Sequence, residues 1–427
     1  MLLVYTQKCT PRIDYVFKHI CTRILGVKVD FTATIETFIA HTGPKMSYGK
    51  QPIGNELFVQ SAGLLQQQGV ESIEIHVKDW EGVKAFFSVG EKSVLPFDIF
   101  AAGFFLLSRY EEYLPQVKDE WGRYPAQESI GFKEEFLEWP VIDIWAQRLK
   151  NVLLQQFPDM IFSPYHYTEH HVVNARVPYQ YANRGMFRSV IGYASDLWRL
   201  RIAPLYRRTQ VLFNLRNDAF DTFHFIINSV KDSKRSLAFF FLLGESNLFN
   251  ESIDTKRQRF RSLIKYVADY KEVGLLFSYD TLSDYERMKQ QKRTMEAITN
   301  RQIVATMNDH YAVTLPEVYR NLIELEVSRD YTMVYPETPG FRAGTCTPFL
   351  FYDLDYEIKT PLIIQPIAAT TKAFETMKLS EIEPYLKRLQ NRVMEVQGTF
   401  TVIFSNTNFA ANASSFWRRF FQQSYSA

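Results

Sequence analysis

This chain of 427 residues has few cysteines and a net charge close to zero. Only Cys9, Cys21 and Cys346 occur, far apart in the sequence. Three thiols so spaced cannot build a disulfide framework or a four-thiolate zinc site. The 49 basic residues nearly balance the 47 acidic ones, for a net charge of +2. Because nucleic-acid binding usually needs a clear excess of positive charge, nucleic acid is not an expected partner.

Long hydrophobic runs are missing as well. The most apolar stretches, 99–107 and 237–243, are far shorter than the roughly 20 residues that span a bilayer. The first residues, MLLVYTQK, contain too short an apolar run for a signal peptide, and charged residues soon follow. Neither a glycine-rich phosphate loop nor the Gly-x-Ser-x-Gly pattern of serine hydrolases occurs. We therefore expect a cytoplasmic protein.

Aromatic residues, in contrast, are abundant at 15%, with 35 Phe, 24 Tyr and 6 Trp. Such side chains fill hydrophobic cores and also line sugar-binding clefts, so the excess alone leaves both uses open. Many of them fall in apolar runs, as do Phe100, Phe104, Phe105 and 239–241. We expect these to serve packing, which leaves only aromatics near strand ends as candidates for sugar contact.

The first 160 residues predict a mixed α/β domain. Alternating or apolar segments at 74–77 and 85–89 are typical of strands. The strongest helix signal covers 99–113, where Asp98 is placed to cap the N-terminus and Pro115 follows the end. Its apolar residues run nearly all the way round, which predicts a buried helix. A second helix is predicted at 142–156.

From residue 161 to 427, apolar strand-like runs alternate with helical segments. This pattern is typical of parallel strands that are buried on both faces. About seven such units favour a closed or nearly closed (β/α) barrel, with function at the carboxyl ends of the strands. The predicted strands are 172–175, 237–243, 273–278, 303–306, 362–365 and 399–404, and the predicted helices are 258–270, 283–298, one opened by Pro316, and 380–396.

Several strings resemble the polysaccharide-deacetylase-like proteins of Bacteroidetes. The segments 96–115 (PFDIFAAGFFLLSRYEEYLP) and 119–126 (DEWGRYPA) resemble their N-terminal domain. Four later segments resemble their NodB-homology barrel: 218–223 (DAFDTF), 239–244 (FFFLLG), 330–333 (DYTM) and 340–354 (GFRAGTCTPFLFYDL). The resemblance implies removal of acetyl groups from polysaccharides. That chemistry uses a divalent metal held by one Asp and usually two His, with an Asp as base and a His as acid.

The residues that carry this chemistry in the family are replaced here. Asn174 and Arg176 stand at its Asp-x-Asp, Leu276 at a metal-binding His and Ser405 at the acid His, while Ser278 persists. An amide is a weak metal ligand, and a guanidinium can neither accept a proton nor tolerate a nearby divalent ion. We therefore expect no bound cofactor or metal, no catalytic residue, and a pseudoenzyme that binds a glycan or scaffolds an envelope-polysaccharide pathway protein.

Two other functions remain open. One is an active carbohydrate deacetylase or hydrolase with a relocated site at Asp309, His310 and Arg342, which would need a divalent metal such as zinc. The other is a peripheral membrane or assembly factor. Six arginines and several aromatics against the single acid Asp196 occupy 184–208, and a similar tail, FWRRFF, occupies 416–421. For both segments, however, the preferred interpretation is an amphipathic helix that packs on the barrel.

Two short motifs permit a metal but also a plain structural interpretation. His166, His170 and His171 have the spacing that can hold a metal on one helical face, or they belong to a polar linker before the first barrel strand. Asp353 and Asp355 form either a metal pair or a loop with capping carboxylates. Neither motif is accompanied by a further set of ligands.

Overall fold

The computed structural model describes every residue except 164–165, 183–185, 232, 234, 245–252, 256, 412 and 427. Residues 2–156 form the N-terminal region, which contains a four-stranded parallel sheet in the order β2-β1-β3-β4. This sheet was not predicted. Its strands are β1 (Leu2–Tyr5), β2 (Val29–Thr32), β3 (Lys45–Gly49) and β4 (Leu57–Gln60). The helices of the region are α1 (Pro11–Phe17), α2 (Ile35–Ala40), α3 (Ile99–Leu107), α4 (Ile130–Lys133) and α5 (Val141–Gln156).

The predicted helix after Asp98 is confirmed, but it is shorter than expected. Asp98 caps it by accepting hydrogen bonds from the amides of Phe100 (3.1 Å) and Ala101 (3.0 Å). All nine residues of α3 are buried, as its apolar circumference predicted. The helix ends at Leu107 because Arg109 adopts a left-handed conformation (φ 55°), and a 3-10 turn at Tyr110–Tyr113 follows.

The two predicted N-terminal strands are wrong in different ways. Segment 74–77 alternates as predicted, and Ile75 and Val77 pack on the core, but the segment has no strand neighbour in the described structure. The strand expected at 85–89 stops at Ala85, because Phe87 takes a positive φ of 62° that no strand permits. What forms instead is a short antiparallel hairpin of β5 (Lys78–Trp80) and β6 (Val83–Ala85).

The second region is built on an eleven-stranded mixed sheet. Parallel neighbours follow the order β14-β12-β11-β10-β8-β7-β17-β15, and β13 adds an antiparallel edge to β14. The strands are β7 (Thr168–Ala175), β8 (Ser236–Gly244), β9 (Ile253–Asp254), β10 (Glu272–Phe277), β11 (Ala305–Asn308), β12 (Arg329–Asp330), β13 (Phe349–Asp353), β14 (Ile358–Ile364), β15 (Ala369–Thr370), β16 (Thr399–Phe400) and β17 (Val402–Ser405). The short strands β9 and β16 pair with β8 and β7.

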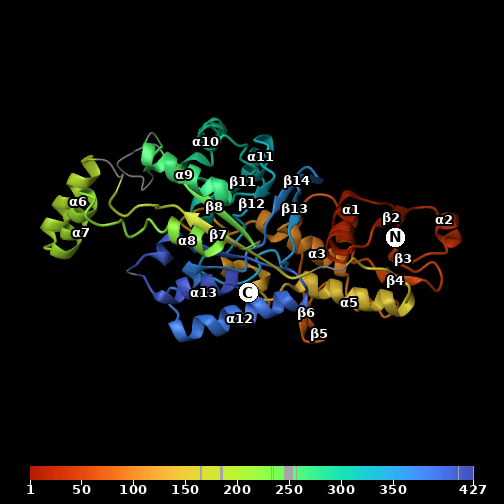
Figure 1. Ribbon diagram of the computed structural model, residues 1–427. Coiled ribbons are helices and arrows are strands. Elements are labelled where there is room, and N and C mark those ends of the chain that lie inside the picture. Colours follow the sequence, from red (N-terminus) through yellow and green to blue (C-terminus); the bar gives the residue numbers. More distant parts are fainter. Residues whose placement is uncertain are drawn as a thin grey trace.

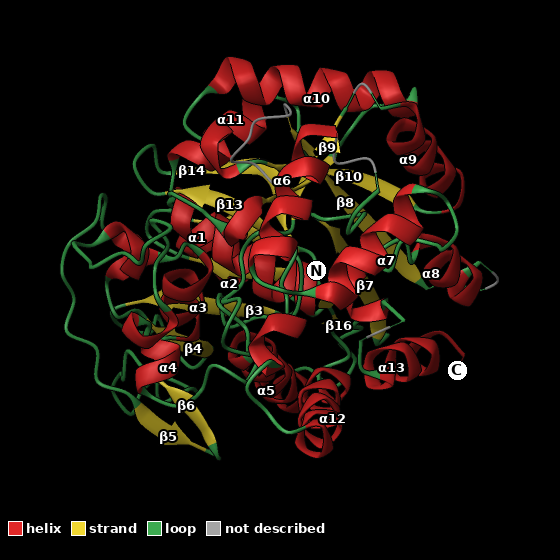
Figure 2. Ribbon diagram, turned by 90° about the vertical axis from the view of Figure 1, so that its left-hand side faces the viewer, coloured by secondary structure: helices red, strands yellow, loops and turns green. Residues whose placement is uncertain are grey.

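Helices pack around this sheet (Figure 2), except that α6 and α7 project from one end of the molecule (Figure 1). They are α6 (Met186–Trp198), α7 (Ile202–Leu212), α8 (Phe223–Val230), α9 (Gln258–Tyr270), α10 (Tyr285–Thr299), α11 (Glu317–Glu324), α12 (Leu379–Glu395) and α13 (Ser415–Ser426). The helix predicted at 258–270 matches α9, and most others agree within two residues. No helix in the described ranges has the length and apolar character needed to cross a bilayer.

Successive side chains along each strand point to opposite faces of the sheet, so a hydrophobic core forms on each face. Inward-facing side chains such as Val172, Phe240, Leu276 and Ile403 form one small cluster, whereas neighbouring residues such as Phe277 join the large core beneath the helices. The segment between β14 and β15 connects the two ends of the row of parallel strands. At one end the Gln365 amide donates to the carbonyl of Asp330 on β12, and at the other the Ala368 amide donates to the carbonyl of Thr401 beside β17, both at 2.9 Å. The described ladders nevertheless end at β13 and β15, so the structure is a curved mixed sheet, and the closed seven-stranded barrel stays a prediction.

The two regions lie side by side, with the N-terminal sheet at the right of Figure 1. They share the large hydrophobic core. Tyr352 of β13 contacts Tyr15 of α1 and Phe104 of α3, with ring centroids 5.0 and 5.1 Å apart. The N-terminal region can therefore contribute side chains to a site at the strand ends.

Candidate functional site

The chain is strained where β11 ends. His310 and Tyr311 both have φ of 55°, a region that non-glycine residues rarely occupy. Each such residue costs about 1–3 kcal/mol, and such strain concentrates at functional sites. The turn directs Asp309 and His310 toward the end of β7, where Asn174 and Arg176 lie.

An ion pair joins these two strand ends. Arg176 Nε donates to Asp309 Oδ1 at 2.7 Å, and the Asp309 side chain is only 5% exposed. The Arg176 amide donates to Asn174 Oδ1 at 3.1 Å, which orders the end of β7. His310 Nε2 lies 3.5 Å from the guanidinium. The carboxylate that follows β11 is thus neutralised by the Arg176 cation that follows β7.

A loop of the N-terminal region forms one wall of the site. The indole of Trp121 stacks on the His310 imidazole, with centroids 3.6 Å apart and planes 9° apart. Asp119 holds this loop by accepting from the Trp121 amide (2.9 Å) and from Arg123 Nε (2.6 Å). Arg123 in turn donates to the His310 carbonyl at 2.9 Å. Tyr279, 40% exposed, meets Trp121 edge to face at 5.4 Å, so three rings form an aromatic cluster beside the ion pair.

The electrostatics keep the imidazole neutral. Burial lowers the pKa of His310, the guanidinium groups of Arg176 and Arg123 lower it further, and Asp309 opposes them. A neutral imidazole is both a donor and an acceptor, so it can hydrogen-bond a hydroxyl group. Burial also raises the pKa of Tyr311 to about 12, so its hydroxyl stays protonated and contacts Asn174 Nδ2 at 3.4 Å.

The other positions singled out from the family pattern make no described hydrogen bond or ion pair with Arg176, Asp309 or His310. Ser405 nevertheless lies beside Asn174, because the two are register partners on the neighbouring parallel strands β17 and β7. Leu276 is completely buried in the inner core. Ser278 takes part in the turn after β10, where it donates to Thr281 Oγ1 (3.3 Å) and accepts from Gln291 Nε2 (2.9 Å). Ser405 caps the 3-10 turn after β17 by accepting from the Thr407 amide at 3.3 Å.

Arg342 belongs to a different cluster from Asp309 and His310. Its guanidinium binds Glu112 through two bonds of 2.9 and 2.7 Å and is 1% exposed. Arg109 binds the same carboxylate at 2.8 Å and also donates to the Arg342 carbonyl. Among the described contacts of Arg342, none reaches Asp309 or His310. The suggested three-residue catalytic group is therefore not assembled, and Arg342 ties the region of the large mixed sheet to the N-terminal region.

The histidine motif is divided between the segment before β7 and the strand itself. His166 is exposed and lies in no helix or strand, as the linker interpretation predicted, whereas the helical face assumed by the metal interpretation does not form. His170 and His171 are buried on β7, where consecutive side chains point to opposite faces. His170 stacks on Tyr331 at 5.4 Å, whereas His171 meets Phe404 at 5.4 Å. Two neighbours on one strand cannot close on a shared ion. Across the described residues, no group of three or more His, Cys, Asp or Glu side chains has the geometry for a metal.

The aspartate pair and the tail both have structural partners. Asp353 and Asp355 bind Arg320 at 2.6 and 3.0 Å in the turn between β13 and β14, so the loop interpretation is confirmed. The tail forms α13, in which Phe416, Trp417 and Phe421 are buried. Phe421 meets Phe404 of β17 with centroids 5.3 Å apart. The tail therefore packs on the sheet and does not offer its aromatics to a membrane.

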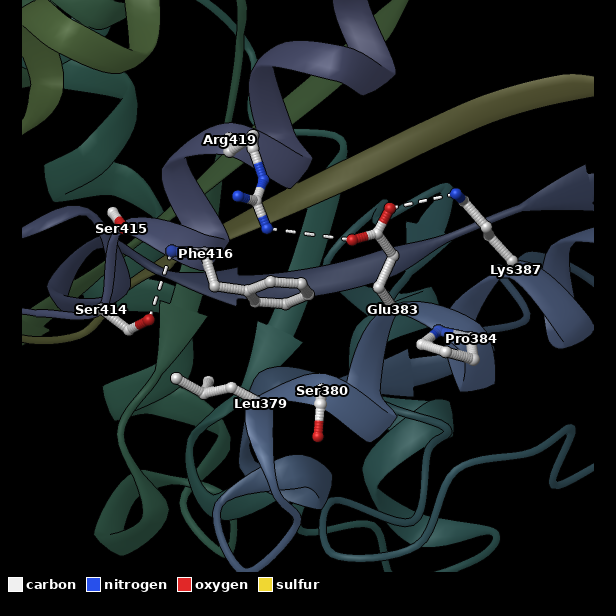
Figure 3. Close-up of a pocket in the computed structure, with 9 residues that line it drawn as sticks. All are labelled: Leu379, Ser380, Glu383, Pro384, Lys387, Ser414, Ser415, Phe416 and Arg419. Carbon is white, nitrogen blue, oxygen red and sulfur yellow. Dashed lines mark hydrogen bonds and ion pairs between the residues drawn. The ribbon is translucent and has the colours of Figure 1, made fainter.

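A groove of about 540 Å³ lies between α12 and the start of α13 (Figure 3). Glu383 at its edge is 3.0 Å from Lys387 and 3.9 Å from Arg419. The groove contains no residue predicted to act in chemistry, and its charged lining residues, Lys387 and Arg419 against Glu383, are already paired with one another. We consider the strand-end cluster the better candidate for a functional site.

The sequence analysis missed Trp121, Tyr279 and Arg123 as site residues. Trp121 and Arg123 do lie in the DEWGRYPA string, whose resemblance to a family N-terminal domain was noted without a role. A tryptophan in a turn, with an aspartate two positions earlier that can accept its backbone amide, is a pattern that could have predicted Trp121 as a residue lining a site. Tyr279 follows Ser278 and carried no separate signal.

Comparison with known proteins gives a family match for the N-terminal region. Residues 2–158 match a family of unknown function, DUF7033. No curated protein matches the chain. Among solved structures, the chain is similar to a presumed polysaccharide deacetylase from Mycobacterium smegmatis, at 8% identity and a TM-score of 0.38 over 62% of this chain and 85% of that one. It is also similar to BA3943 from Bacillus anthracis, described as a pseudoenzyme of the CE4 family, at 12% identity and a TM-score of 0.27 over 62% and 63% of the two chains.

Proposed function

We propose that the strand-end cluster binds a carbohydrate and does not carry out metal-dependent deacetylation. The single observation that carries this proposal is the stack of Trp121 on His310 directly beside the Arg176–Asp309 ion pair. A sugar ring presents a face of C–H groups and a rim of hydroxyls. Partly exposed aromatic rings suit the face, and a few fixed polar groups suit the rim.

The polar groups of the cluster have complementary roles toward hydroxyl groups. The Arg176 guanidinium, 28% exposed, can donate, and the neutral imidazole of His310 can donate or accept. The strained turn and the Asp119-centred loop hold both groups in place before any ligand arrives. Such pre-organisation reduces the ordering cost of binding.

The same groups argue against hydrolysis assisted by a metal. A divalent ion near Asp309 would have to displace or tolerate the Arg176 cation, which is held at 2.7 Å. Leu276, buried at the position of a family ligand, has no lone pair to offer. We accordingly propose a NodB-like, seven-stranded barrel that has become a pseudoenzyme, in a cytoplasmic protein of the polysaccharide-deacetylase-like kind with domains at 1–160 and 161–427. Its partner is then a glycan or an envelope-polysaccharide pathway protein.

Isothermal titration with a panel of acetylated and de-acetylated oligosaccharides tests the proposal. We expect at least one ligand to bind, and Trp121→Ala to weaken its binding about tenfold or more, since stacking contacts contribute about 0.5–1.5 kcal/mol beyond the area they bury. Tyr270→Ala is the matched control, because Tyr270 is an exposed aromatic on α9. Equal loss in both variants, or no binding across the panel, would contradict the proposal.

A further inference from the structure

The helices α6 and α7 form a hairpin at the end of the molecule opposite to the N-terminal sheet (Figure 1). Residue 184 lies outside the described residues, and side chains are described from Val190 onward. The hairpin is braced from within. The Tyr193 hydroxyl meets Thr209 Oγ1 at 2.8 Å, and Arg208 binds Asp196 at 2.8 Å while it covers the Tyr193 ring. Its shape thus does not depend on a partner.

Apolar side chains are exposed on this hairpin far more than elsewhere. Of the 23 large hydrophobic side chains that are exposed in the described structure, ten lie within 190–215. The most exposed are at the tip, where Trp198 is 90%, Leu200 83%, Ile202 79% and Leu197 67% exposed. A soluble surface scatters such residues singly, so this concentration indicates a contact surface.

The turn at the tip of the hairpin contains a strained backbone conformation. Leu200 ends α6 in the left-handed conformation (φ 51°), a position that usually takes glycine. The turn is closed by hydrogen bonds from the Leu200 amide to Leu197 O (3.0 Å) and from the Arg201 amide to Asp196 O (2.8 Å). A strained, solvent-exposed leucine contributes nothing to the protein's own core. Its exposed position is consistent with a contact made outside the chain.

The charge of the hairpin favours an anionic partner. Residues 190–217 carry five arginines and one aspartate, a net charge of +4 in a chain whose total is +2. Asp196 is already paired with Arg208, which leaves Arg199, Arg201, Arg207 and Arg216 exposed. At the tip, cationic and apolar residues alternate along one turn. Shallow insertion into an anionic lipid surface needs this combination, with a Trp at the interface and arginines at the phosphates.

We propose that the tip of this hairpin inserts into the interfacial layer of an anionic membrane. Trp198, Leu200 and Ile202 enter the boundary between headgroups and acyl chains. Arg199 and Arg201 contact the lipid phosphates, and Arg207 adds to the attraction. The proposal is independent of the strand-end cluster, because it rests on a different element and a different chemistry.

Co-sedimentation of the full chain with vesicles tests the proposal. We expect binding to phosphatidylcholine vesicles that contain phosphatidylglycerol, weaker binding to phosphatidylcholine alone, and a decrease between about 50 mM and about 500 mM salt as the charges are screened. The double variant Leu200→Ser/Ile202→Ser should lower the partition coefficient at least about tenfold. Ile161→Ser is its matched control, because Ile161 is 89% exposed and lies away from the hairpin.

A charge variant separates the two contributions. Arg201→Glu should weaken binding to the anionic vesicles about tenfold, whereas Lys265→Glu on α9, with the same change of charge at an exposed site, should have little effect. Circular dichroism should show every variant folded. No binding at low salt, or unchanged binding of the Leu200→Ser/Ile202→Ser variant, would overturn the proposal. So would self-association of the chain without vesicle binding, if that variant abolished it, since the hairpin would then be a protein contact.

Discussion

The buried Arg109–Glu112–Arg342 cluster provides a demanding test of how the two regions are held together. Glu112 is 4% exposed in its side chain and accepts from both guanidinium groups at 2.7–2.9 Å. Those two cations hold the pKa of Glu112 below its usual value, against the burial that raises it. Replacing the carboxylate by an amide removes a countercharge that both guanidinium groups share, and among the described ion pairs it leaves Arg109 with Glu111 but Arg342 with none. Breaking a buried ion pair in this way costs about 3–5 kcal/mol.

We therefore expect Glu112→Gln to lower the free energy of unfolding by about 3–5 kcal/mol in urea denaturation at pH 7. Glu381→Gln on the exposed face of α12 is the matched control and should change it by less than about 0.5 kcal/mol. Because the folded pKa of Glu112 is depressed, its contribution should be present above the unfolded pKa of about 4.3 and should be lost as pH falls through the folded pKa. Equal stability of Glu112→Gln and Glu381→Gln would refute this reasoning.

Three further outcomes are expected. Arg176→Met should raise the pKa of His310, because the Arg176 guanidinium lowers that pKa and the Asp309 carboxylate, freed from its ion pair, raises it. An NMR titration of the imidazole measures the pKa, and an unchanged value in the variant would contradict the expectation. Leu276→Ala should cost about 2–5 kcal/mol of unfolding free energy if Leu276 fills the inner core, whereas Leu379→Ala, 52% exposed, should cost less than about 0.5 kcal/mol. Burial raises the pKa of Asp98 to about 6, so the folded protein binds a proton more tightly than the unfolded chain does. Relative to the Asp98→Asn variant, the native protein should therefore lose about 2–3 kcal/mol of unfolding free energy as pH rises from about 4 to above 6. If the unfolding free energies of the two proteins changed with pH in parallel, this expectation would be contradicted.

Periodicity predicted the parts of the fold that depend on local pattern. The run 237–243 and the helix 258–270 were found because a buried parallel strand and an amphipathic helix each have a clear pattern. Strand β12 has only two residues, Arg329 and Asp330, which is too short for any pattern. The N-terminal sheet was missed because its strands are four or five residues long and carry polar residues such as Asp30 and Ser47.

The site was predicted only in part, because its members come from distant segments. The sequence analysis singled out residues at the ends of β7 and β11, and the structure brings Arg176 and Asp309 together there, since the carboxyl ends of parallel strands meet at one edge. The sequence analysis grouped Arg342 with Asp309 and His310, whereas in the structure Arg342 binds Glu112, which lies 230 residues earlier. Trp121 reaches His310 from the N-terminal region across 189 positions of sequence. No local rule predicts a contact of that kind.

Binding without turnover is the central claim, and one assay on one ligand tests it most directly. The acetylated oligosaccharide that binds best in calorimetry would be incubated with the native chain, with and without added zinc, nickel or cobalt, and released acetate would be measured. We expect saturable binding that depends on Trp121 and no acetate above the rate without protein. Acetate release that requires a metal and is lost in His310→Ala would contradict the account and establish an active hydrolase.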